Sequence, residues 1–165
     1  MNYGENPYVE YDGPANTQPR LYKGEVDSRL PATARVINIF GTNKNKIYPL
    51  NIIQKEGVIN DTHENEKIVL FHQSGLVSVL DQADISKSKD IGAVGVFSPI
   101  VDSKLLTFKK TEKGFQDIET NSIWTITGKC IEGKLTGSQL EKIIHGNHFA
   151  FAWFEFNPDC IIYGQ

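Results

Sequence analysis

Short runs of apolar residues alternate with polar turns from about residue 34 to the end of the chain. The runs are short, and most are rich in β-branched and aromatic residues, which is typical of β-strands rather than helices. The predicted strands are ARVINIFG, the start of NKIYPLNIIQKEGVIND, KIVLFH, LVSVLD, AVGVFSPIV, KLLTFKK, GFQDIE, SIWTITG, KCIEGKL and CIIYG. LVSVLD follows KIVLFH closely enough for a hairpin with Gly75 in the bend. The spacing predicts an antiparallel meander.

Two stretches have helical signals instead. Pro49 can open a short helix at its first turn. The segment 148–156 is apolar nearly all round, with Asn147 before it as an N-cap and Asn157-Pro158 after it as a stop. We therefore expect a fully buried helix of two to three turns there. The predicted fold class is α+β, mostly antiparallel β-strands with a few short helices.

The first 31 residues differ from the rest in composition. They hold four of the seven prolines and four of the six tyrosines of the chain. Proline blocks regular strand pairing, while tyrosine rings need a surface to cover them. The sequence predicts an extended Pro/Tyr-rich arm over residues 1–31, packed on a single α+β domain formed by residues 32–165.

Composition narrows the function classes. A net charge of −3 leaves no basic surface for nucleic acid. No apolar stretch approaches the roughly 18 residues that span a membrane, so no transmembrane segment is expected. The first residues do not have the pattern of a signal peptide, although a removed signal or lipid anchor would leave export open. The two cysteines, Cys130 and Cys160, favour free buried thiols, and the alternative is a disulfide that implies an oxidising compartment.

The motifs of phosphate loops, dinucleotide-binding turns, zinc proteases and serine hydrolases are absent. Within HQSG, His72 and Ser74 would share a face if the strand persisted that far, as a nucleophile and its base must. The alternative is a turn serine beside a hydrogen-bonded histidine.

The richest polar stretch surrounds Asp117 and Glu119, whose side chains would share one face of a strand, and continues through Ser122 to Trp124. Such a carboxylate pair can bind a cation or act in acid–base chemistry. The commoner outcome is that the carboxylates cap backbone N–H groups of the turn.

His145 and His148 are three residues apart and could share one face of a helix. A closed metal site needs further ligands, which His72 or the carboxylates would have to supply. We therefore predict no metal site, and the cofactor is unknown.

Nearly the whole chain, about residues 6–163, resembles the domain-of-unknown-function family 3179. The resemblance rests on NPYVEYD, DSRLPATARVINI, VLFHQSGLVSVLDQADISKSKDIGAVGVFSP and the C-terminal half. The most specific part is the acidic–x–acidic–Thr–x–Ser–x–Trp run from Asp117 to Trp124, with Gly128, Gly133 and Gly137 after it. The resemblance implies a helical aromatic segment near the C-terminus. It also implies placement outside the cytoplasm or at the cell surface, since members are often exported or lipid-anchored.

Some members of that family are catalogued as candidate selenoproteins, and many have a cysteine-rich bend where this chain has His72-Gln73-Ser74-Gly75. The resemblance therefore transfers no thiol redox role to this chain, and it implies no defined reaction.

The function favoured by the sequence is a binding or accessory module, with an unknown small molecule or protein as its partner. Its predicted polar pocket lies where residues 72–75, 117–124 and 145–148 converge. One alternative is a metal-dependent or redox-linked enzyme that uses His72, His148 and a carboxylate. The other is a structural subunit of a larger assembly. Whether the protein is an enzyme stays open, as does its oligomeric state.

Overall fold

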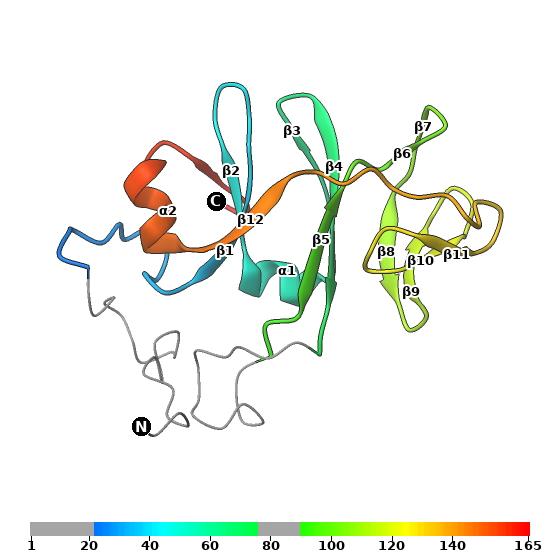
Figure 1. Ribbon diagram of the computed structural model, residues 1–165, viewed down its shortest axis with the longest axis horizontal. Coiled ribbons are helices and arrows are strands. Elements are labelled where there is room, and N and C mark those ends of the chain that lie inside the picture. The colour runs from blue at the N-terminus through cyan, green and yellow to red at the C-terminus, as the bar shows by residue number, and fades with distance from the viewer. Residues whose placement is uncertain (1–21, 76–89) are drawn as a thin grey trace, which may run out of the picture.

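A computed structural model of the protein describes residues 22–75 and 90–165 (Figure 1). The elements are β1 (Arg35–Ile39), β2 (Lys46–Pro49), α1 (Leu50–Glu56), β3 (Val58–His63), β4 (Glu66–Gln73), β5 (Ala93–Phe97), β6 (Ile100–Val101), β7 (Lys104–Leu105), β8 (Phe108–Thr111), β9 (Gly114–Asp117), β10 (Ile123–Trp124), β11 (Cys130–Glu132), β12 (His145–Phe149), α2 (Ala150–Phe156) and β13 (Ile161–Ile162). The predicted α+β class, dominated by antiparallel strands, is confirmed. The predicted strand LVSVLD lies outside the described residues.

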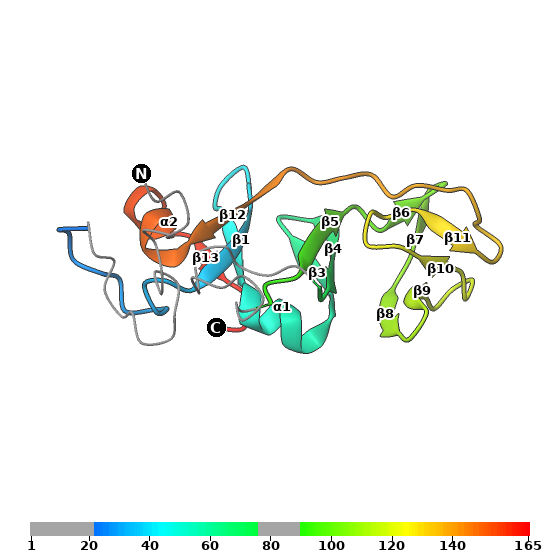
Figure 2. The same cartoon turned by 60° about the horizontal axis from the view of Figure 1, so that its bottom comes forward.

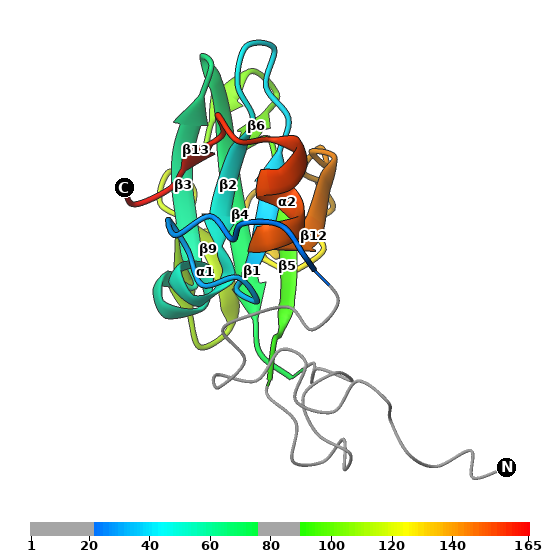
Figure 3. The same cartoon turned by 90° about the vertical axis from the view of Figure 1, so that its left-hand side faces the viewer.

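The strands form three sheets that stand side by side (Figure 1). The first sheet has the order β12-β1-β2-β13, the middle sheet β3-β4-β5, and the third sheet β11-β10-β9-β8, while β6 and β7 form a separate hairpin. The third sheet is the predicted meander, because its neighbours are consecutive in the chain and antiparallel. Figure 3 shows α2 beside the first sheet.

The middle sheet is buried on both faces, and β4 shows why its sequence is apolar at every position from Ile68 to Phe71. Ile68 and Leu70 belong to the core shared with the first sheet. Val69 and Phe71 point the other way, into the core shared with the third sheet. Alternate strand residues face opposite sides, so a strand between two cores has no polar face.

One extended segment, residues 139–149, runs past all three sheets. Gln139 forms a bridge with Lys129, Lys142 forms a bridge with Phe97 at the end of β5, and the segment ends as β12 beside β1. It is visible as the long orange stretch in Figure 2. Hydrogen bonds along this segment therefore tie the third sheet to the middle and first sheets.

The predicted C-terminal helix over residues 148–156 is present, but it begins at Ala150 rather than at residue 148. The chain is a strand through Phe149, and Asn147 is an exposed residue of β12 rather than an N-cap. Pairing with β1, in which Asn147 lies opposite Ile37, overrides the local capping preference. The helix is also not fully buried, because Phe156 is 82% exposed while Trp153 packs inward. α1 follows Pro49 as predicted.

Residues 22–31, the described part of the predicted arm, contact α2 (Figure 3). The ring of Tyr22 lies 5.3 Å from that of Phe151. The guanidinium of Arg29 lies 4.4 Å from the ring centre of Phe154 and donates a hydrogen bond to the carbonyl of Pro158. Residues 1–21 lie outside the described residues.

Cys130 and Cys160 are free thiols, which confirms the favoured alternative. Cys130 lies in the core beside the third sheet, and Cys160 in the core between the first sheet and α2. Burial raises the pKa of both thiols. Among the residues that the structure describes, no helix has the length and apolar composition needed to cross a membrane.

An ion pair joins the first and middle sheets. Lys46 of β2 donates to Asp61 of β3 at 2.6 Å, and the Tyr48 hydroxyl donates to the same carboxylate oxygen at 2.8 Å. Burial disfavours the charged carboxylate, but the hydrogen bonds from Lys46, Tyr48 and the Thr62 amide outweigh it. They hold the pKa of Asp61 below its usual range.

This lowered pKa predicts how stability responds to acid. A carboxyl whose pKa is lower in the folded than in the unfolded protein adds stability above its unfolded pKa of about 3.9. That contribution is lost as the pH falls through the lower, folded pKa. We expect wild type to exceed Asp61→Asn in free energy of unfolding at pH 7, and the difference to shrink below pH ~4. Urea titrations across the range measure it, and a difference that does not vary with pH would contradict the ion pair's role.

Candidate functional site

The acidic turn between β9 and β10 is organised by Asp117, which has no exposed surface. One carboxylate oxygen accepts from the Thr120 amide at 2.6 Å. The other accepts from the Thr120 hydroxyl at 3.0 Å, the Ser122 amide at 3.1 Å and the Trp124 indole N–H at 2.9 Å. A buried carboxylate requires such a set of donors, and here the turn and the following strand β10 supply all four.

Ser122 carries the network further, to the segment after β11. Its hydroxyl lies 2.6 Å from that of Thr120 and accepts a hydrogen bond from the Leu135 amide at 3.2 Å. Gly133 packs against Ser122 so closely that a Cβ there would lie 2.7 Å from the Ser122 Cα, and its φ of 100° also favours glycine. Asp117, Ser122 and Trp124 therefore form one rigid unit that sets the positions of Thr120 and Leu135.

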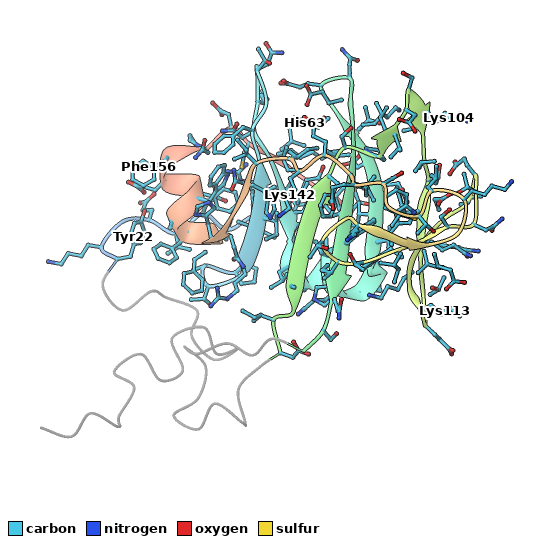
Figure 4. The ribbon with its side chains drawn as sticks, turned by 45° about the vertical axis from the view of Figure 1, so that its right-hand side comes forward. Tyr22, His63, Lys104, Lys113, Lys142 and Phe156 are labelled. Carbon is cyan, nitrogen blue, oxygen red and sulfur yellow. The ribbon has the colours of Figure 1, made fainter. Side chains whose placement is uncertain are left out.

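A hollow of about 420 Å³ lies between this unit and the β6–β7 hairpin. We name it the hairpin hollow. Its apolar lining comes from Val101, Leu105, Leu106 and Leu135, and its polar lining from Asp102, Lys104, Glu119 and Thr120. Figure 4 shows the hairpin, labelled at Lys104, projecting from the end of the molecule opposite α2.

A second cavity, of about 290 Å³, adjoins the hairpin hollow. It shares Leu105 and Leu106 with the hairpin hollow and continues over β3 and β4, where Asp61 and Lys67 line it. Leu105 is 47% exposed, although it stands between two cavities. Ile100, its cross-strand partner, is 48% exposed, so the hairpin presents adjacent apolar side chains, and such a patch suits an apolar partner group.

Glu119, the second acid of the predicted pair, is exposed and does not join the Asp117 network. One of its carboxylate oxygens accepts from the Thr107 amide at 2.8 Å. The two carboxylates thus cap backbone N–H groups, the commoner of the two outcomes weighed for them. Glu119 also lines the hairpin hollow.

His72 and Ser74 do not form a nucleophile and base. β4 ends at Gln73, so Ser74 lies beyond the strand and is exposed. The buried His72 ring has its Nε2 3.4 Å from the carbonyl of Ile91, and burial lowers its pKa. The bend after β4 is stabilised by Asp90, whose carboxylate accepts hydrogen bonds from the Gly75 amide.

His145 and His148 lie on a strand, where residues three apart point to opposite faces, so the prediction of a shared helix face is wrong. His145 donates through Nδ1 to the carbonyl of Ile143 at 2.9 Å. His148 donates through Nε2 to the Asn38 side-chain oxygen at 3.0 Å, and its ring lies 5.0 Å from that of Trp153.

The three predicted segments do not converge. Residues 145–148 belong to the first sheet, His72 to the middle sheet and residues 117–124 to the third sheet and its turn (Figure 1, Figure 2). Tertiary pairing separates them, because the middle sheet stands between the other two. Within residues 22–75 and 90–165, no three His, Cys, Asp or Glu side chains are placed to hold a metal ion.

The residues that line the hairpin hollow were mostly missed by the sequence reasoning. Val101, Leu105, Leu106 and Leu135 read as ordinary strand residues. Glu119 and Thr120 fall within the predicted segment 117–124, and of these two only Glu119 was named as a candidate site residue. The available signal was the polar pair Asp102-Ser103 within an apolar stretch, since it marks a two-residue hairpin.

Comparisons with known proteins identify the family of the chain. No curated protein and no solved structure matches the chain. A family model described as Protein of unknown function (DUF3179) matches residues 1–160, which includes the Asp117 turn and the residues of the hairpin hollow. The chain therefore belongs to this family of proteins of unknown function.

Proposed function

We propose that the protein is a binding module that takes an apolar group of its ligand into the hairpin hollow. The observation that carries this proposal is the pairing of an apolar lining with a wall that is fixed in advance. Leu105, Leu106 and Leu135 supply the lining, while the buried Asp117 network holds Thr120 in place. Ligand sites are typically hollows of about 300–1,000 Å³ with apolar walls and a few fixed polar groups.

The fixed wall supports binding because little has to be ordered when the ligand arrives. Thr120 is held through both its amide and its hydroxyl, and Leu135 is held through its amide by Ser122. A site that is ordered beforehand loses less conformational entropy on binding than a mobile one. The leucine lining beside a fixed threonine suits contact with an apolar group, which is why we propose a binding module.

Substitution of Leu105 tests the site. We expect Leu105→Asp to weaken binding of the neutral fluorescent probe N-phenyl-1-naphthylamine at least about tenfold, which corresponds to about 1.4 kcal/mol. The physical reason is that a carboxylate would replace an apolar wall shared by both cavities. Fluorescence titration of the folded variant measures the affinity.

Ile131→Asp is the matched control, since Ile131 is 52% exposed on β11 and lines neither cavity beside the hairpin. The control should bind the probe as wild type does. If the two variants weaken binding equally, or if wild type binds no probe, the hairpin hollow is not the binding site.

A further inference from the structure

We propose that the ligand of the hairpin hollow is an extended peptide, which pairs through its backbone with the edge of β7 and inserts an apolar side chain. This inference rests on the proposed binding function and identifies the chemical class of the ligand. It is carried by the direction in which the backbone of Leu105 points.

The hairpin itself fixes that direction. Asp102 and Ser103, with φ of 48° and 64°, form a two-residue turn between Val101 and Lys104. In such a hairpin Val101 and Lys104 are a hydrogen-bonded pair, and the next such pair is Pro99 and Leu106, where the Leu106 amide donates at 2.8 Å. Leu105, between them, is opposite Ile100 in a non-hydrogen-bonded pair. The N–H and C=O of Leu105 therefore point away from β6.

The hydrogen bonds of Thr107, two residues after Leu105, show in which direction the N–H and C=O of Leu105 point. Its amide donates to the Glu119 carboxylate at 2.8 Å, and its carbonyl accepts from the Ile118 amide at 2.9 Å. β7 ends at Leu105, but the Leu106 amide points to Pro99 and the Thr107 amide to Glu119, so the backbone continues to alternate as in an extended strand, in which groups two residues apart point to the same side. Leu105 consequently directs its N–H and C=O toward the side of the strand on which residues 118–120 lie.

The hydrogen-bonded ladder between β8 and β9 extends as far as Thr107 and Ile118 and ends there. Beyond Ile118 the chain turns away, because Asp117 binds the Thr120 amide and Asn121 takes a φ of 59°. Leu105 and Thr120 both line the hairpin hollow and are not paired as strand residues. A third strand placed there would extend the existing ladder along β7, as in peptide recognition by strand addition.

The lining indicates the sequence of the peptide. The leucine side chains around the hollow suit one apolar residue. Asp102 and Glu119 place two carboxylates at the hollow against the single ammonium of Lys104. Because alternate residues of a strand share a face, basic residues two positions before and after the apolar one are favoured. Opposite charges at the rim act mainly on selectivity and on the rate of association.

The probe for this inference is the peptide acetyl-Lys-Thr-Leu-Thr-Lys-amide, in which the leucine and both lysines share one face, together with two derivatives that are N-methylated at alternate amides, one in each register. Strand addition uses only alternate amides of the added strand. We expect calorimetry to show at least about tenfold weaker binding for one register and unchanged binding for the other. Replacing both lysines of the peptide by glutamate should also weaken binding.

Equal affinities for the two methylated peptides would overturn strand addition, as would an absence of binding by the parent peptide. The neutral naphthylamine probe separates this failure from failure of the proposed function. If the probe binds with the expected sensitivity to Leu105→Asp while the peptides fail, the hollow is a binding site for an apolar ligand other than a peptide.

Discussion

Replacing Asp117 by Asn is expected to lower the free energy of unfolding by about 3–5 kcal/mol, because hydrogen bonds to a charged acceptor are lost and at least one buried donor is left without an acceptor. The carboxylate accepts four hydrogen bonds, and three of them end on one oxygen. An amide in the same place has only one accepting oxygen. Its NH₂ group would face either the Thr120 amide or the donors of Ser122 and Trp124. Urea denaturation followed by tryptophan fluorescence measures the loss.

Asp102→Asn is the matched control, because it makes the same chemical change at an exposed turn residue. A change within about 0.5 kcal/mol is expected there. If Asp117→Asn is as mild as the control, the network does not stabilise the turn. Below its melting temperature Asp117→Asn should also weaken binding of the naphthylamine probe, because Thr120 would no longer be held at the hollow.

Phe71→Ala is the second large effect, with an expected cost of about 3–5 kcal/mol. Phe71 has no exposed surface and joins the middle sheet to the third sheet. Its ring stacks on Phe115 with centroids 4.1 Å apart and contacts Phe108 and Phe97 at 5.1 and 5.4 Å. Truncation leaves a cavity between two sheets that cannot easily close. Thermal or chemical denaturation measures the change.

Phe156→Ala makes the same truncation at a side chain that is 82% exposed on α2. The expected change is within about 0.5 kcal/mol, since little contact is lost. A Phe71→Ala protein as stable as the Phe156→Ala protein would mean that the two sheets are not held together at this position.

The histidines show where local reasoning failed. The spacing of His145 and His148 suggested that both lie near the start of a helix. Instead, this stretch is the strand β12, which pairs with β1, and the two histidine rings point to opposite faces of it. Pairing with a strand more than 100 residues earlier cannot be read from a local pattern. The Asp117 turn shows the opposite case, because all four donors to its carboxylate lie within seven residues of it.

The sequence by itself determined the features that depend on neighbouring residues. These are the strand-rich α+β class, the helix after Pro49, the meander of the third sheet and the capping role of Asp117. Each follows from side-chain alternation, backbone restriction or a hydrogen bond within a few residues. Only the tertiary structure decided which strands meet, and hence that the hairpin hollow, rather than the histidine segments, is the candidate site. Strand partners are chosen by burial of whole faces against one another, and that choice depends on residues far apart in the chain.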